Sequence, residues 1–424
     1  MGGVAYRLLN HSSEKRGAML YQAYKLVDDV CAPARIGAAG LERRLRVLGD
    51  MRPASWFWDH AAAACELVEL SGFTHVHPGF GVDEVVGHNG GGAPVRETRA
   101  MGTPFCDLVR FRRADAQGLP RVLLVAPMSG HYASLLRGTI GALVRDFDVY
   151  VTDWRNARDI PLAEGVMTLD GYVQHVIDFL RFMGPGGHVV AVCQPVVAAL
   201  AAVAVMAEDG DACAPASLTL MAGPIDTRVS PTKVNELATS KPIEWFRDNM
   251  ISTVPAGLPG AGRKVYPGFL QLTAFMSMNA ERHARSFGEL YRARLARDDA
   301  KAEQIRAFYQ EYFAIMDLDA EFYLQTIETI FQRCDLPRGR LAFKGRRVDP
   351  GAIRRTFLFT VEGEKDDICA PGQTMAAHDL CTGLRPYMKS HHLQPGVGHY
   401  GVFNGRKWET AIYPRVREHI QTSD

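Results

Sequence analysis

A single cysteine, Cys193, stands where the chain passes from a strand-like run to a helix-like run. Residues 188–192 are short and mostly β-branched, as in a buried strand, and residues 196–206 are rich in alanine, as in a closely packed helix. A tight strand-to-helix turn lifts a reactive atom above the sheet and points it at the helix N-terminus. Cysteine is also a common buried structural residue. This stretch alone therefore leaves both a nucleophile and a structural cysteine open.

A nucleophilic thiol needs a base and a carboxylate, and the sequence offers both further along the chain. Beside an imidazole at a helix N-terminus, a cysteine pKa can fall from about 8.5 to roughly 3.5–7.5. We expect His399 to take the thiol proton and later return a proton to the leaving alkoxide. A carboxylate must hold the other ring nitrogen. The spacing of Gly363, Asp366 and Ile368 favours Asp366, with Asp367 as the alternative, although either could instead cap a helix.

Two backbone N–H groups are expected to stabilise the oxyanion of the tetrahedral intermediate. They belong to Gln194, which follows the cysteine, and to Met128, in the loop after an early strand. Losing one such donor typically costs about 100- to 1,000-fold in rate. We expect Ser129, His131 and Trp154 to line the substrate pocket, because each follows the end of a predicted strand. Ser129 is a weaker candidate for the nucleophile, since it lacks the strand–nucleophile–helix setting.

The elements that position these residues alternate between strands and helix-length segments. The predicted strands are 122–125, 149–152, 188–192, 217–221 and 356–361. Such alternation predicts a mostly parallel α/β sheet with its sites at the carboxyl ends of the strands. The order of nucleophile, acid and histidine is that of α/β-hydrolases. Residues 105–112 alternate loosely, which predicts an antiparallel strand at the edge of this sheet.

The length of 424 residues exceeds the roughly 250–300 that one hydrophobic core usually supports. We expect an N-terminal helical extension over 1–95, a hydrolase core in two parts over 96–222 and 356–424, and a helical cap over 223–355. A separate domain with its own role is the alternative for 223–355. Residues 87–92 are glycine-rich but lack a following Gly-Lys-Ser/Thr, so we interpret them as a flexible linker rather than a phosphate loop.

The composition excludes several classes of function. The chain has 48 basic and 47 acidic residues, which argues against a general nucleic-acid or anionic-membrane binder. Its eight cysteines show no CxxC pair and no metal-ligand spacing, so we expect a reduced cytoplasmic protein without a metal site. The apolar run 189–207 is interrupted by Gln194 and Pro195, which argues against a membrane span. The N-terminus has no apolar stretch typical of a secretory signal.

Seven short segments give the chain a family resemblance. They are Pro127-Met128-Ser129-Gly130-His131, Val151-Thr152-Asp153-Trp154, Val192-Cys193-Gln194-Pro195, Gly223-Pro224-Ile225-Asp226, Val265-Tyr266-Pro267-Gly268-Phe269-Leu270-Gln271, Val361-Glu362-Gly363-Glu364 with Asp366-Asp367-Ile368, and Gly398-His399-Tyr400-Gly401. From about Met19 to Glu418 the chain resembles an intracellular polyhydroxyalkanoate (poly(3-hydroxybutyrate)) depolymerase. Members of that family resemble α/β-hydrolases in which a cysteine replaces the usual serine.

The resemblance implies an esterase that cleaves stored 3-hydroxyalkanoate polymer or oligomers through a thioester, with Cys193, Asp366 and His399 as its triad and no cofactor. Its implied partner is a polymer granule in the cytoplasm. The oligomeric state is left open, with a homodimer as one option. A related synthase-like acyltransferase, with an alcohol or coenzyme A as acceptor, is the first alternative. Pro195 argues against it, because it stands where the synthase box has glycine. A granule-binding protein with an inactive site is the second. The family commonly begins at a motif found here at Met19, so we expect residues 1–18 to be dispensable.

Overall fold

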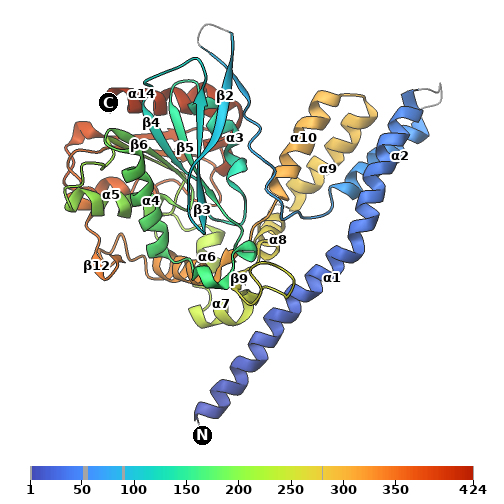
Figure 1. Cartoon of the computed structure of the whole chain (residues 1–424), viewed down its shortest axis with the longest axis horizontal. Helices are drawn as coiled ribbons and strands as arrows, with labels where there is room; N and C mark the ends of the chain where they lie inside the picture. The colour runs from blue at the N-terminus through green and yellow to red at the C-terminus, as the bar shows by residue number, and fades with distance from the viewer. Residues whose placement is uncertain (1, 51–55, 88–90, 279, 424) are drawn as a thin grey trace.

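The computed structural model describes residues 2–50, 56–87, 91–278 and 280–423. Its main strands are β1 (Glu84–Val86), β2 (Gly92–Gly102), β3 (Cys106–Arg113), β4 (Arg121–Val125), β5 (Asp148–Trp154), β6 (Gly187–Val192), β7 (Ser217–Met221), β13 (Phe357–Gly363) and β14 (Lys389–Gln394). They form one sheet in the order β1-β2-β3-β5-β4-β6-β7-β13-β14 (Figure 1). The first three run antiparallel to their neighbours, and the six from β5 to β14 are parallel.

Helices cover both faces of this sheet, which is why its central strands are apolar on both sides. Helices α4 (Leu169–Met183) and α5 (Val196–Glu208) pack on one face, and α3 (Arg137–Leu143) and α14 (Tyr413–Ser423) pack on the other. Successive residues of β4 therefore enter different cores. Helix α5 is buried on nearly every side, which accounts for its unbroken apolar sequence. Within the described residues, we find no helix with the length and apolar character to cross a membrane.

A large insertion between β7 and β13 lies over the carboxyl ends of the parallel strands. Its helices are α6 (Lys233–Thr239), α7 (Ile243–Met250), α8 (Gly268–Met278), α9 (Ala280–Leu295), α10 (Asp299–Tyr312) and α11 (Ala320–Gln325), followed by a π-helical turn over Thr326–Gln332. A small antiparallel sheet of β8 (Ser252–Thr253), β9 (Lys264–Tyr266) and β10 (Leu318–Asp319) lies among them. A further hairpin joins β11 (Ala342–Phe343) to β12 (Arg346–Arg347).

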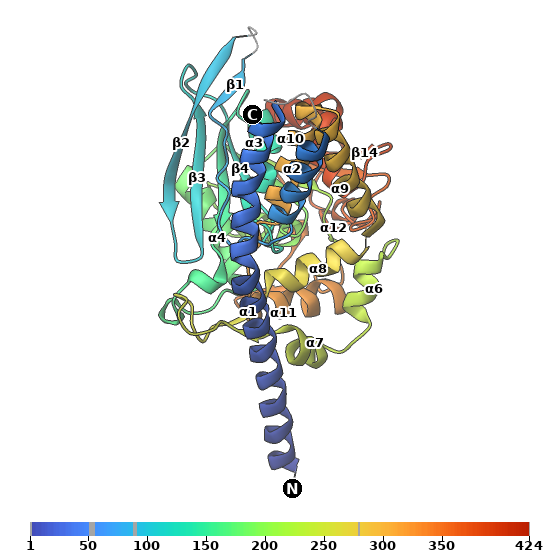
Figure 2. The same ribbon diagram turned by 90° about the vertical axis from the view of Figure 1, so that its right-hand side faces the viewer.

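The N-terminal helices pack on this insertion rather than on the sheet. Helix α1 (Gly2–Asp50) runs alongside β8 and α7, and α2 (Trp56–Glu69) packs on α9. In both views the N-terminal end of α1 extends beyond the rest of the molecule (Figures 1 and 2). The ring of Tyr24 stacks on Phe269 of α8 with 4.1 Å between centroids. The Tyr21 hydroxyl donates to the buried carboxylate of Asp317, 2.5 Å away. These contacts fasten α1 to the insertion at its residues 21–24.

This architecture is an α/β-hydrolase fold with an N-terminal helical segment and a helical cap insertion. The five predicted parallel strands are confirmed, with bounds shifted by one or two residues. The predicted edge strand at 105–112 is wrong in its position, because β1 and β2 lie outside β3. Val86 pairs with Gly92, so Gly92 of the glycine-rich stretch belongs to strand β2. Residues 88–90 of the expected linker lie outside the described residues.

Candidate active site

Cys193 occupies a strained turn between β6 and α5. Its φ is +67°, a left-handed conformation that side chains other than glycine rarely adopt. Its amide donates to the carbonyl of Met221 at the end of the neighbouring strand β7, with 2.8 Å between nitrogen and oxygen. The turn also lies close to Gly223, because a Cβ at position 223 would be only 2.4 Å from the Cys193 carbonyl oxygen. The turn thus has the geometry of a nucleophile elbow.

His399 joins this cysteine to a carboxylate. Its Nε2 lies 3.1 Å from the Cys193 sulfur, and its Nδ1 lies 2.8 Å from Oδ2 of Asp366. Both histidine and aspartate are buried. The three side chains come from the loops after β6, β13 and β14, whose carboxyl ends meet at one edge of the sheet. The structure therefore brings together the three residues that the sequence singles out.

The loop after β13 selects Asp366 over its neighbour. Oδ1 of Asp366 accepts from the amides of Ile368 and Cys369 at 2.9 and 2.8 Å, which leaves Oδ2 free for the imidazole. Asp367 is exposed and points into a different cavity. The buried carboxylate of Glu362 accepts from the amides of Gly372, Thr374 and Met375 and so holds the following turn. Sequence reasoning missed this structural role, because a lone glutamate at a strand end carries no distinguishing signal.

The electrostatics of the three residues suit proton transfer. Burial works against protonation of His399, but the Asp366 carboxylate and the Cys193 sulfur outweigh it and raise the pKa of the imidazole well above its ordinary value. A second cysteine, Cys369, borders the same cavity. Burial raises the pKa of the Cys369 thiol, which keeps it protonated. Cys193 is thus distinguished from Cys369 by its contact with the imidazole.

Cys193 opens onto a cavity of about 150 Å³ between the sheet and the cap. Among the described residues that line it, none carries a charged side chain. The cap contributes apolar and aromatic side chains, namely Val234, Phe275, Leu318, Phe322, Tyr323, Ile327 and Phe331. Sequence reasoning did not find these seven, because residues far apart in an insertion reach one cavity only through the fold. The cavity is shaped for an apolar group next to the sulfur.

Met128 and Gln194 both border this cavity, but the Met128 amide is already engaged. It donates to the side-chain oxygen of Gln194 at 3.3 Å, while the Gln194 side-chain nitrogen is buried without a partner in the described structure. A substrate carbonyl that uses the Met128 amide must therefore displace the Gln194 carboxamide. This contact could not be predicted from the sequence, because it joins two loops 66 residues apart.

Only one of the three predicted pocket residues borders the cavity. Ser129 does, and the predictions for His131 and Trp154 are corrected. Trp154 is buried under the loop after β4, where its indole nitrogen donates to the Ala126 carbonyl at 2.9 Å. His131 is buried beside the rings of Phe275 and Tyr312, and burial lowers its pKa to about 4. Both side chains are buried and neither borders the cavity, which their place after a strand end cannot reveal.

The C-terminal part of the chain is similar to one known protein family. Residues 222–424 match the family model described as "PHB de-polymerase C-terminus", where PHB is poly(3-hydroxybutyrate). A search of curated protein sequences found no match. This family match and the fold support a hydrolase similar to PHB depolymerases.

Solved structures resemble the chain at low sequence identity. A 2-hydroxy-6-oxo-6-phenylhexa-2,4-dienoate hydrolase from Rhodococcus sp. strain RHA1 is 13% identical, with a TM-score of 0.42 over 78% of this chain and 99% of its own. A thermophilic esterase from Thermogutta terrifontis is 15% identical, with a TM-score of 0.40 over 78% and 99%. A putative lipase from Acinetobacter baumannii AYE is 12% identical, with a TM-score of 0.42 over 78% and 93%. Similarity at this level concerns the fold alone.

Proposed function

We propose that the protein hydrolyses ester bonds of 3-hydroxyalkanoate polymer or oligomers through a thioester on Cys193. The observation that carries this proposal is the hydrogen-bonded chain from Asp366 through His399 to the Cys193 sulfur, at the mouth of an apolar cavity. The PHB depolymerase match over residues 222–424 supports the choice of polyester. Such a polymer is stored inside cells, so we place the protein in the cytoplasm, at the granule surface.

The reaction proceeds in two halves. His399 takes the thiol proton, and the thiolate attacks the ester carbonyl to give a tetrahedral oxyanion. The amides of Met128 and Gln194 bind that oxyanion after the Gln194 carboxamide moves off the Met128 amide. The carbon–oxygen bond then breaks, and the His399 proton passes to the leaving alkoxide. In the second half His399 takes a proton from water, the hydroxide attacks the thioester, and the carboxylic acid leaves as the thiol re-forms.

Asp366 serves this cycle by orientation and charge. It accepts from Nδ1 of His399, so that Nε2 faces the sulfur, and its charge stabilises the imidazolium that forms in each half. The apolar cavity takes the acyl unit, because its cap side chains match the alkyl branch of a hydroxyalkanoate. No metal or redox cofactor takes part in these steps.

The test is incubation of the pure protein with amorphous 3-hydroxybutyrate polymer, followed by identification of the products. We expect free hydroxy acid and oligomers, and the Cys193→Ala variant should release none while melting within about a degree or two of the native protein, since one small side-chain group is lost. The activity of the Cys193→Ser variant should also fall strongly, because a hydroxyl depends on the base to remove its proton more than a thiol does. A Cys193→Ala protein that degrades polymer at the native rate would overturn the mechanism.

The same experiment separates the alternatives. If a product appears only when coenzyme A or an added alcohol accepts the acyl group, the protein is an acyltransferase. If Cys193→Ala loses granule binding and the native protein shows no turnover, it is a binding module.

A further inference from the structure

A second cavity, of about 580 Å³, adjoins the catalytic histidine. His399 borders this cavity, Cys193 borders the apolar one, and Ile368 lies in the walls of both. His399 therefore stands between the nucleophile and the second cavity. In the proposed reaction this histidine hands its proton to the leaving alkoxide. The leaving group and the second cavity are therefore both next to His399.

The walls of this second cavity are strongly basic. Four cationic side chains border it, from Arg282, Lys365, Arg406 and Lys407, against one carboxylate, that of Asp367. Over the described chain, no carboxylate lies within ion-pair distance of any of the four. Asp367 therefore offsets only part of their positive charge, and the excess raises the local concentration of anions.

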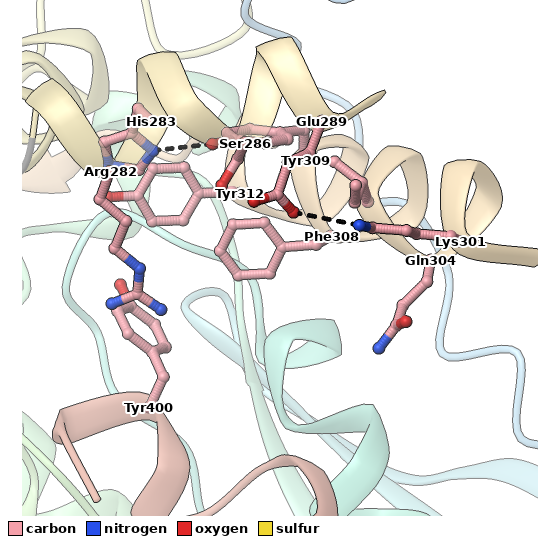
Figure 3. A pocket seen from close by; sticks show the side chains of 11 residues that line it. Arg282, His283, Ser286, Glu289, Lys301, Gln304, Phe308, Tyr309, Tyr312 and Tyr400 are labelled. Atoms are coloured by element: carbon pink, nitrogen blue, oxygen red, sulfur yellow. Dashed lines mark hydrogen bonds and ion pairs between the residues drawn. The ribbon is translucent and has the colours of Figure 1, made fainter. Parts of the chain in front are cut away.

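The cap and the hydrolase core both contribute to this basic cavity. Arg282 extends from α9 with its guanidinium toward Tyr400, the residue after the catalytic histidine (Figure 3). Arg282 and Tyr400 also border a third cavity, of about 350 Å³, between α9, α10 and the loop that carries Tyr400. Lys365 precedes the catalytic aspartate, and Arg406 and Lys407 lie on α13 (Gly405–Lys407). One cation from the insertion thus borders the same cavity as three cations from the hydrolase core.

A leaving group of a 3-hydroxyalkanoate chain has one anionic feature. Each ester bond joins the carboxyl group of one unit to the hydroxyl oxygen of the next, so the fragment that leaves as an alkoxide always includes the carboxyl end of the chain. That end carries the only negative charge of the polyester. We propose that the basic cavity binds this terminal carboxylate, so that the enzyme cleaves short fragments from the carboxyl end. This inference rests on the proposed esterase function and adds a direction and a substrate preference to it.

The test compares two 3-hydroxybutyrate trimers with identical ester bonds. One has a free carboxylate, and in the other the carboxyl end is a neutral N-methyl amide. We expect kcat/KM for the free acid to exceed that for the amide by about tenfold, because several cations act on one charge. The difference in kcat/KM should come from a lower KM for the free acid. It should be smaller at 0.5 M salt, which screens exposed charges.

Charge variants assign the effect to this cavity. Arg282→Gln should lower the preference for the free acid about two- to fivefold, as expected for one exposed ion pair. Arg282→Glu should lower it further, and Asp367→Asn should raise it. Arg285→Gln is the matched control, because Arg285 is an exposed residue of the same helix that does not border the cavity. The preference of each variant is measured relative to its own hydrolysis of p-nitrophenyl butyrate, which has no carboxylate, and Arg285→Gln should leave that hydrolysis unchanged.

The outcomes are distinguishable. Equal kcat/KM values for the two trimers in the native protein, or an Arg282→Glu variant with unchanged preference, would overturn the carboxylate site while leaving the esterase function intact. No cleavage of either trimer or of the small ester would instead overturn the proposed function. A preference that Arg285→Gln reduces as much as Arg282→Gln would show a general surface-charge effect and contradict the site.

Discussion

At the scale of single residues, the candidate site depends on how tightly its carboxylate is held. Two backbone amides bind Oδ1 of Asp366 and direct Oδ2 to the imidazole, whereas Asp367 is exposed. The sequence favours Asp366 through its spacing from Gly363, and it identifies Cys193 and His399 by their places after strands. It does not show that Trp154 and His131 turn into the core, because a strand end fixes a side chain's position and not its direction.

The two neighbouring aspartates should differ sharply in mutational effect. Asp366→Asn should reduce kcat for ester hydrolysis by about 10,000-fold, because the amide favours the wrong tautomer of His399. Asp367→Asn should leave kcat on a small neutral ester near the native value. Steady-state kinetics on p-nitrophenyl butyrate measures both. A crippled Asp367→Asn protein beside a nearly normal Asp366→Asn protein would reverse the assignment.

At the scale of elements, the buried parallel strands and the antiparallel strand β3 were predictable, and the outer strands β1 and β2 were not. Strands buried on both faces give continuous β-branched runs such as that of β6, which stand out in a sequence. Strand β2 is exposed along most of its length, so its sequence lacks that signal. The packing of α1 on the cap was also not predictable, because Tyr21 and Asp317 meet across 296 positions of the chain.

The attachment of α1 should depend on Tyr21 and not on the residues before it. A chain that begins at Met19 retains the hydroxyl that bonds Asp317 and should melt within a few degrees of the full chain. Tyr21→Phe should lower the free energy of unfolding by about 1–3 kcal/mol, because it removes the donor to Oδ2 of a buried carboxylate whose other oxygen accepts from the Gly268 amide. Tyr387→Phe, at a residue 71% exposed, is the control for loss of a hydroxyl. A large destabilisation on removing residues 1–18 would show that this segment packs on the molecule.

The cap should govern the binding of bulky substrates. Phe275 borders the apolar cavity, so Phe275→Ala should raise KM for polymer and oligomers more than for a small soluble ester, by about three- to tenfold. Trp245→Ala is the matched aromatic control, because Trp245 packs on Phe246 and does not border the cavity. The measurement is KM of each variant on both the oligomer and the small ester. Equal losses on both would indicate a role in folding or chemistry.

At the scale of the whole molecule, several histidines have lowered pKa values and are neutral in the folded protein. Burial lowers the pKa of His75 to about 3 and those of His131 and His419 to about 4. In the unfolded chain these groups titrate near 6.5, so the unfolded state binds more protons as the pH falls. Asp317 acts in the opposite sense, because burial raises its pKa to about 6 and its contribution is lost as the pH rises. His399, whose pKa is raised, acts in the same sense as Asp317, but four histidines with strongly lowered pKa values, His378 among them, outnumber these two groups.

The protein should therefore lose stability between about pH 6.5 and pH 4. The histidine contributions are complete above 6.5 and fall as the pH drops toward the pKa values of the folded state. Urea unfolding at pH 7.0 and pH 5.0 should give a clearly lower midpoint at pH 5.0. His419→Gln removes one of these groups and should flatten the dependence. Equal midpoints at the two pH values would show that these histidines titrate alike in both states.

The central claim is that the acyl group passes through the sulfur of Cys193. Native protein mixed with 3-hydroxybutyrate trimer, quenched in acid within milliseconds and digested, should yield a Cys193 peptide heavier by one or more 3-hydroxybutyryl units. The adduct should be sensitive to hydroxylamine, as a thioester is, and absent from Cys193→Ala. An adduct on Ser129, or turnover with no adduct on Cys193 at any quench time, would contradict the account.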